Sequence, residues 1–242
     1  HLAEAAREEN IDLGKSAVRK IIVAGEPGGS IPGTKARIEE SWRAKVFDHT
    51  GATEIGGHGL TCLGQCGVHL NEGEFLIEVI NPETLKPADE GELVITNLGR
   101  IGSPVLRYRT GDHVRISRDV CECGRTFARM DGGIIGRIDQ MLIVRGVNIF
   151  PSSLESIVRS FPRVQEFRVI VNDISAMDQL VIVVEVAGDH PEEVVKAIER
   201  ETSHRLGLRI GVELAPQPLM RFEMKASRVI DNRGIQAKPS LF

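Results

Sequence analysis

The hydrophobic pattern of this chain changes twice along its length, and these changes limit the folds it can adopt. Near the start, apolar runs at 21–24 and 45–48 flank a helical pattern over 34–42. This order of strand, helix and strand is typical of a parallel α/β arrangement. A charged helical pattern precedes it and is expected to end near Lys15. The first segment therefore predicts an α/β layer with loops at the strand ends.

The pattern after this segment predicts two further kinds of structure. From about residue 68 to 117, short alternating runs are separated by Gly, Pro and Asn, which indicates an antiparallel β subdomain. After residue 139 a small α+β domain is expected. Its predicted strands are 141–145, 167–171, 180–186 and 209–215, and its predicted helices are 152–160 and 191–206. We therefore predict a mixed α/β and α+β fold, with residues 1–138 as part of a large domain and 139–242 as a small one.

The composition excludes several classes of protein. The 242 residues carry a formal net charge of −4, without the basic excess that nucleic-acid binders usually show. No apolar run approaches the roughly 20 residues of a membrane helix, and the first ten residues lack the apolar core of a signal peptide. We expect a cytoplasmic protein that binds neither nucleic acid nor membrane, with a homodimer left open. Because no Met begins the chain, we also expect it to start within a longer protein.

The four cysteines fall into two close pairs, Cys62 with Cys66 and Cys121 with Cys123. In a cytosolic chain such pairs favour metal binding over disulfides. Zinc takes four S or N ligands, often two from each of two loops. His69 lies three residues after Cys66 and adds an imidazole to the possible ligands. The sequence predicts a structural zinc site, and composition alone suggests the four thiols as its ligands.

Two loops near the start carry groups suited to a nucleotide. Gly25 follows a predicted strand, and glycine permits the close approach of a flat ring. In the loop that follows the next strand, Thr53 offers a hydroxyl for a phosphate oxygen and Glu54 offers a carboxylate suited to Mg²⁺. Taken singly, each loop is more often an ordinary turn.

Two later turns add charged groups. Asp112 follows the apolar pair 105–106 and is expected at a strand end, where its carboxylate accepts hydrogen bonds from the two hydroxyls of a ribose. Arg137 offers a guanidinium for an anion. The loops at Gly25, at Thr53 and Glu54, and at Asp112 together predict a nucleotide site.

Five motifs in this order resemble those of the phenylacetate-CoA ligases, a branch of the adenylate-forming (acyl-CoA synthetase) enzymes. The resemblance spans nearly the whole chain, and the longest motif is specific to this branch. The motifs are AGEP (24–27), GATEIGG (51–57), YRTGD (108–112), GRIDQMLIVRGVNIFPSSLE (136–155) and RFEMKASRVIDNR (221–233). The resemblance implies that 1–138 is the C-terminal part of the AMP-binding domain and 139–242 the small mobile domain.

The resemblance also implies a role for each candidate residue. Lys225 would be the catalytic lysine of adenylation, and Asp139 the hinge of the small domain. The nucleotide would be bound by Gly25, Glu26 and Pro27 at the adenine, Thr53 at the AMP phosphate, Glu54 through Mg²⁺, Asp112 at the ribose and Arg137 at ribose or phosphate. The implied zinc ligands are Cys62, His69, Cys121 and Cys123, with Cys66 as the competing ligand.

The reaction implied is ATP-dependent activation of an aryl carboxylic acid to an acyl-AMP, followed by transfer to CoA. ATP or AMP, Mg²⁺, CoA and a structural Zn²⁺ are the implied cofactors. The chain departs from the family pattern at Thr50, Gln140 and Met224, where Tyr, Asp and Gly are usual. It also lacks a Ser/Thr/Gly-rich phosphate loop, so we do not expect it to run the full reaction alone. Transfer to a deazaflavin instead of CoA, or a non-catalytic nucleotide- and zinc-binding module, are the alternatives.

Overall fold

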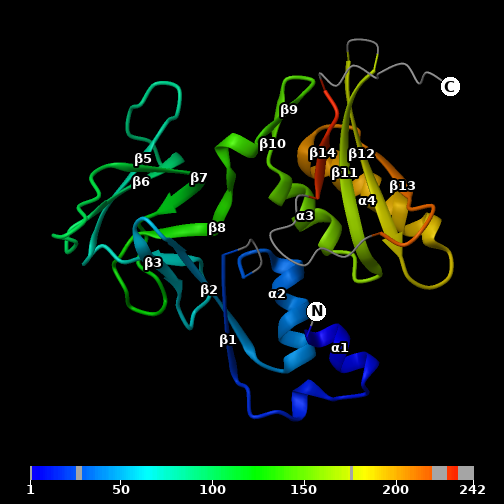
Figure 1. The fold of residues 1–242 in the computed structure, drawn as a ribbon, viewed down its shortest axis with the longest axis horizontal. Helices are drawn as coiled ribbons and strands as arrows, with labels where there is room; N and C mark the ends of the chain where they lie inside the picture. Colours follow the sequence, from blue (N-terminus) through cyan, green and yellow to red (C-terminus); the bar gives the residue numbers. More distant parts are fainter. Residues whose placement is uncertain (1, 26–28, 175–176, 220–227, 234–242) are drawn as a thin grey trace. The chain divides into compact units, whose positions relative to one another are not determined.

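The computed structural model describes residues 2–25, 29–174, 177–219 and 228–233. The chain divides into two compact units, His1–Gln140 and Met141–Phe242, called the first and second unit below. Among the described residues, no helix combines the length and apolar character that crossing a bilayer would require. The mixed fold class is confirmed, since the first unit contains a large sheet and the second an α+β arrangement (Figure 1).

The first unit begins with the predicted strand–helix–strand order. Strands β1 and β2 pair in parallel, with Ile21 opposite Val46. The expectation of one helix ending near Lys15 is wrong. Asn10 has a left-handed φ of 57°, and the Asp12 side chain accepts a hydrogen bond from the N–H of Gly14, so the chain turns between two short helices. These elements are α1 (Leu2–Glu8), η1 (Leu13–Lys15), β1 (Lys20–Ala24), α2 (Pro32–Trp42) and β2 (Lys45–Ala52).

Eight strands of the first unit form one sheet in the order β1-β2-β3-β4-β8-β7-β6-β5. The pairs beyond β1–β2 are antiparallel, as the pattern of short alternating runs predicts. The fully buried residues Val68, Leu93, Val114 and Met130 pack together in its core. The remaining elements are β3 (Gly56–Thr61), β4 (Val68–Leu70), β5 (Phe75–Ile80), β6 (Glu90–Asn97), β7 (Tyr108–Ser117), β8 (Arg129–Arg137) and η2 (Ile138–Gln140).

The prediction that Asp112 lies at a strand end is wrong, because β7 begins at Tyr108 and runs through it. Glu92 pairs with His113 and Val94 with Arg109, so one residue of β6 faces the three residues 110–112 of β7. Such a β-bulge bends a strand and redirects its side chains. The apolar pair 105–106, which suggested the end of a strand, lies in the loop before β7, and Leu106 is exposed.

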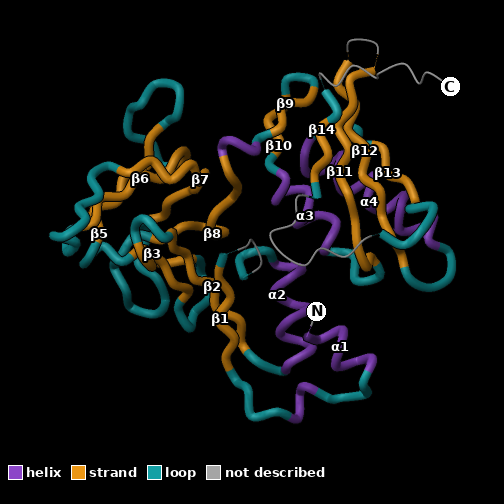
Figure 2. Tube along the Cα trace, viewed as in Figure 1, coloured by secondary structure: helices purple, strands orange, loops and turns teal. Residues whose placement is uncertain are grey.

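The second unit packs two helices and a hairpin against a four-stranded sheet with the order β13-β12-β11-β14 (Figure 2). Strands β11 and β12 are antiparallel, whereas β13 and β14 lie parallel to their neighbours at the two edges. Phe167, Ile182 and Ile198 are buried in the core. The elements are β9 (Leu142–Val144), β10 (Val147–Ile149), α3 (Pro151–Arg159), β11 (Val164–Ile174), β12 (Met177–Val186), α4 (Pro191–Leu206), β13 (Gly211–Leu214) and β14 (Val229–Asp231).

Candidate functional site

The bulge on β7 brings Asp112 beside Arg137, its pairing partner on β8. Arg137 Nη1 donates to the Asp112 carboxylate at 3.4 Å and to the carbonyl oxygen of Thr110 at 2.7 Å. Gly111, between Thr110 and Asp112, has a φ of 74°, and a Cβ there would come within 2.9 Å of the Arg137 guanidinium. The guanidinium can move aside, but residues with a Cβ rarely adopt this left-handed φ. The glycine of the Gly-Asp pair is therefore explained by the backbone.

Two residues hold this bulge: Thr110, which belongs to the YRTGD motif, and Glu92, which the sequence did not single out. The Thr110 hydroxyl donates to the carbonyl oxygen of Leu93 and accepts from the N–H of Asp112, both at 3.0 Å. Glu92 is buried and accepts from Arg109 Nε at 2.9 Å and from the N–H of Gly111 at 3.3 Å. The residues of β6 from Gly91 to Thr96 are all buried, so this strand has no alternation from which the sequence could have identified Glu92.

One guanidinium connects the predicted ribose acid with the predicted hinge. Arg137 Nε and Nη2 donate to the two carboxylate oxygens of Asp139, each at 3.1 Å. These bonds lower the pKa of Asp139. Burial raises the pKa of Asp112, and the Arg137 charge partly opposes this effect. The structure thus brings together three of the predicted residues, with Asp112 mostly buried and Asp139 exposed.

The predicted adenine loop is described only at its start. Gly25 follows β1 and has a φ of 87° and open space where a Cβ would lie, whereas Glu26 and Pro27 lie outside the described residues. After the loop, the Ser30 hydroxyl donates to the buried carboxylate of Asp48. Burial raises the pKa of Asp48, and the bond from Ser30 works against it. The sequence did not single out Asp48, which follows the buried residues Val46 and Phe47 in β2.

The turn between β2 and β3 presents Thr53 and Glu54 to solvent. The buried side chain of Ile55 anchors this turn, and Asn97 Nδ2 donates to the Ile55 carbonyl oxygen at 3.1 Å. Thr50, in the place where the family usually has Tyr, is buried, and its hydroxyl has no hydrogen-bond partner in the described part of the chain. In the sheet, β4 and β8 lie between this turn and the bulge on β7.

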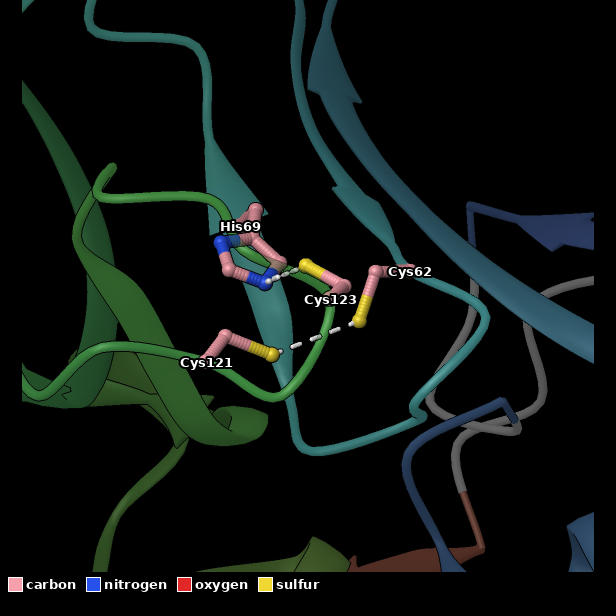
Figure 3. A group of neighbouring side chains, drawn as sticks. All are labelled: Cys62, His69, Cys121 and Cys123. Atoms are coloured by element: carbon pink, nitrogen blue, oxygen red, sulfur yellow. Dashed lines mark hydrogen bonds between the residues drawn. The ribbon is translucent and has the colours of Figure 1, made fainter.

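The structure brings Cys62, His69, Cys121 and Cys123 together, with their ligand atoms all within 4.8 Å of one another (Figure 3). Cys62 follows β3 and His69 lies on β4, whereas the other two belong to the turn between β7 and β8. The Sγ atoms of Cys62 and Cys121 are 3.7 Å apart. His69 Nε2 and Cys123 Sγ are 3.6 Å apart. Ligands about 2.3 Å from a zinc ion at tetrahedral angles are separated by about 3.8 Å.

The surroundings of this cluster also suit a metal. His69 Nδ1 lies 3.3 Å from the carbonyl oxygen of Phe127, which fixes the proton on Nδ1 and leaves Nε2 facing the thiols. Burial raises the pKa of Cys62. The pKa of Cys123 is lowered to about 7, mainly by a hydrogen bond from the backbone of Arg125 to its sulfur. Cys66 is not in this group, and its thiol donates instead to the carbonyl oxygen of Gly64 at 3.2 Å.

The family of the chain follows from its relatives. The phenylacetate-coenzyme A ligase of Thermus thermophilus is 32% identical over 252 residues, covering 99% of this chain and 53% of the relative. That of Escherichia coli K12 is 33% identical over 225 residues, covering 86% and 51%. The chain belongs to the phenylacetate-CoA ligase family. The family model for the AMP-binding enzyme C-terminal domain matches residues 146–233, within the second unit. The chain spans about half the length of these relatives.

A solved structure agrees with this assignment. A 2-hydroxyisobutyryl-CoA ligase in the postadenylation state, in complex with 2-HIB-AMP, is 33% identical and matches with a TM-score of 0.89 over 97% of this chain and 53% of that chain. The same ligase in complex with 2-HIB-AMP and CoA in the thioesterification state matches with a TM-score of 0.57 over 96% and 51%. The fold is therefore that of the adenylate-forming ligases.

Proposed function

We propose that this chain is part of an AMP-forming acid–CoA ligase. In the first half-reaction a carboxylate oxygen attacks the α-phosphorus of ATP and pyrophosphate leaves. In the second, the thiol of CoA attacks the acyl carbon and AMP leaves. The observation that carries the proposal is the bulge on β7, where Asp112 and Arg137 lie side by side in a chain of this family. A carboxylate and a guanidinium together suit a ribose diol next to a phosphate.

The roles we assign follow from the charges that the first half-reaction brings together. The acid and the triphosphate are both negative, so the transition state needs cations around it. Lys225 lies outside the described residues, and we assign it the neutralising charge at the α-phosphate. Glu54 would hold Mg²⁺, and Thr53 would contact the phosphate. Gly25, Glu26 and Pro27 would line the adenine, and we place the hinge at Asp139.

We further propose that Cys62, His69, Cys121 and Cys123 hold a structural zinc ion. Their spacing and the fixed orientation of His69 support this assignment. Four protein ligands close the coordination sphere, which suits a structural rather than a catalytic role. The ion would fasten the turn between β7 and β8 to β4 and to the loop after β3. Cys66, the competing candidate, would remain outside the site.

For the substrate we propose an aryl acid similar to phenylacetate, because the curated relatives are phenylacetate-CoA ligases. A small hydroxy acid is the second candidate, since the 2-hydroxyisobutyryl-CoA ligase is equally similar in sequence at 33% identity. Comparing acid-dependent pyrophosphate exchange with phenylacetate and with 2-hydroxyisobutyrate, in the intact protein that contains this chain, separates the two.

The nucleotide assignment is tested by titrating this chain with AMP in a calorimeter. Asp112→Asn is expected to weaken binding roughly tenfold to a hundredfold, because hydrogen bonds to a charged group contribute about 1.5–3 kcal/mol. Asp119→Asn, at an exposed position of the same unit, is the matched control and should leave the affinity unchanged. Absence of AMP binding by the unaltered chain would favour a non-catalytic module.

A further inference from the structure

Strand β14 is a short edge strand whose position depends on more than its backbone. It consists of three residues, Val229–Asp231, and pairs in parallel with β11. The residue before it, Arg228, accepts a hydrogen bond from the N–H of Val169 at 2.8 Å. So short a ladder gives little stability by itself. Side chains at its ends therefore decide how firmly β14 is held.

The side chain of Arg228 reaches into a buried acidic site on the second unit. Its Nε donates to Glu166 Oε1 at 2.9 Å, and its Nη1 donates to Glu155 Oε1 at 3.3 Å. Its guanidinium carbon lies 5.4 Å from the centre of the Phe167 ring. The Glu166 side chain is only 6% exposed. These contacts fix both the direction and the depth of the Arg228 side chain.

Glu166 already has a partner without Arg228. Arg159 Nη2 donates to the same oxygen at 3.1 Å, and the N–H of Phe167 donates to it at 2.9 Å. Burial would raise the pKa of Glu166, but the bonds from Arg228 and from the Phe167 N–H lower it overall. Buried ion pairs seldom stabilise a fold better than apolar residues of similar size, and the best supported reason for retaining them is structural specificity. Two arginines thus face two glutamates, Glu155 and Glu166, so the charges of the site balance. Arg228 is the member of this site that belongs to the segment before β14, and its role is therefore sought in the placing of that segment.

The opposite end of the same segment is also held by an acid. The N–H of Leu219 donates to Glu185 Oε2 at 2.9 Å. Glu185 lies on β12 and Glu166 on β11, two neighbouring strands of one sheet. Residues 220–227, which include Lys225, connect these two fixed points. Lys225 precedes Arg228 by three residues in the sequence, and three residues of backbone span at most about 11 Å.

We propose that Arg228 is a positioning residue for adenylation, which fixes the point where the segment bearing Lys225 joins the sheet. This inference rests on the proposed ligase function. A lysine that serves one half-reaction must return to the same place at each turnover, and small displacements of catalytic groups are costly. Glu166 holds Arg228 by charge and a hydrogen bond, and the Phe167 ring packs against its guanidinium. We infer that these contacts fix the end of the segment that carries Lys225.

The test compares both half-reactions in the intact protein that contains this chain. Adenylation is measured by acid-dependent exchange of pyrophosphate into ATP, and transfer by thioester formation from supplied acyl-AMP and CoA. Arg228→Met removes the charge and keeps an unbranched side chain. It is expected to lower the exchange rate roughly tenfold to a hundredfold, while thioester formation stays within about threefold. Lys225→Ala should show the same split more strongly, and Arg228→Lys should restore part of the exchange rate.

Arg233→Met is the matched control at the other end of β14. Arg233 Nη2 pairs with Asp231 at 2.7 Å and Nη1 with Asp178 at 3.2 Å, so this variant also loosens the strand. It should lower the melting temperature without separating the two half-reactions. If Arg228→Met folds poorly, Glu155→Gln provides a milder variant, because it weakens one contact of Arg228. It should lower the exchange rate more than the rate of thioester formation, but by a smaller factor.

Equal loss of both half-reactions in Arg228→Met and Glu155→Gln, or no loss in either, would overturn the positioning role alone. No exchange by the unaltered protein, with phenylacetate or 2-hydroxyisobutyrate, would overturn the proposed function and this inference with it.

Discussion

The two units use different chemistry to hold distant segments together. In the first, Cys62, His69 and the Cys121–Cys123 turn gather soft donor atoms from three places in the sequence. In the second, Arg159 and Arg228 converge on the carboxylate of Glu166. Neighbouring thiols attract one another only weakly, whereas the arginines and the glutamate have opposite charges. The first arrangement is therefore expected to depend on the proposed zinc ion, and the second on the ionisation of a carboxylate.

Removing metal should have the largest effect, and it should be confined to the first unit. Structural zinc contributes on the order of 10 kcal/mol in small zinc peptides. Cys121→Ser, or treatment with a chelator, should therefore cost several kcal/mol. The measurement is hydrogen exchange resolved by peptide, together with elemental analysis for about one zinc per chain. Protection should fall around residues 61–69 and 121–128 while β11 and β12 keep theirs. Purified protein without metal would contradict the zinc assignment.

Glu166→Gln should have the next largest effect, confined to the second unit. It removes one of the two carboxylates, Glu155 and Glu166, that Arg159 and Arg228 contact. Breaking a buried pair in this way costs about 3–5 kcal/mol. Because the folded pKa of Glu166 is lowered, its contribution is present above the ordinary value of about 4.3 and is lost as the pH falls through the folded value. Acid should therefore destabilise the unaltered unit more than the variant. The exposed pair of His190 and Glu192 offers Glu192→Gln as a control with little expected effect.

His58 should make the first unit sensitive to acid at a higher pH than the second. It is 1% exposed, and desolvation lowers its pKa to about 4 from 6.5. The folded state favours the neutral ring, so its stability is complete above pH 6.5 and declines as the pH falls toward 4. The loss should reach about 3 kcal/mol. His58→Phe should flatten the pH profile of unfolding over this range, whereas His190→Asn should not. A profile unchanged by His58→Phe would show that another group is responsible.

Cys66→Ser should have the smallest effect. Its thiol donates to Gly64 and is not in the group of four ligands, so the expected cost is within about 0.5 kcal/mol. Comparing its zinc content with that of Cys62→Ser distinguishes the two cysteines directly. Loss of zinc from Cys66→Ser would mean that the metal selects a ligand set different from the one proposed.

The sequence was a good guide where periodicity decides the structure. The parallel pair β1–β2, the antiparallel run to β7 and the α+β unit each follow from the spacing of apolar residues. Places where a turn or a bulge interrupts the spacing of apolar residues were harder to predict. The helix expected up to Lys15 stops at a left-handed Asn10, and the motif ending at Asp112 proved to be a bulge inside a strand.

The candidate site was predictable as motifs but not as contacts. The motifs identified the family, and the structure brought Asp112, Arg137 and Asp139 together. The supporting residues Asp48 and Glu92 were missed, because a buried acid in a strand has the same local pattern as an exposed one on the opposite face. The roles of all the candidate residues stay predictions, and Glu26, Pro27 and Lys225 also lie outside the described part of the chain.

The bulge on β7 makes the proposed nucleotide site depend on the number of residues in this part of the strand. Side chains alternate between the two faces of a strand, so adding or removing one residue sends every later side chain to the opposite face. Three residues, 110–112, fill the space opposite one residue of β6. Substitution at Thr110 would weaken the bulge, but a one-residue deletion there would move Asp112 out of phase with Arg137. Variation in length at this point is therefore a more sensitive sign of a lost nucleotide site than variation in residue type.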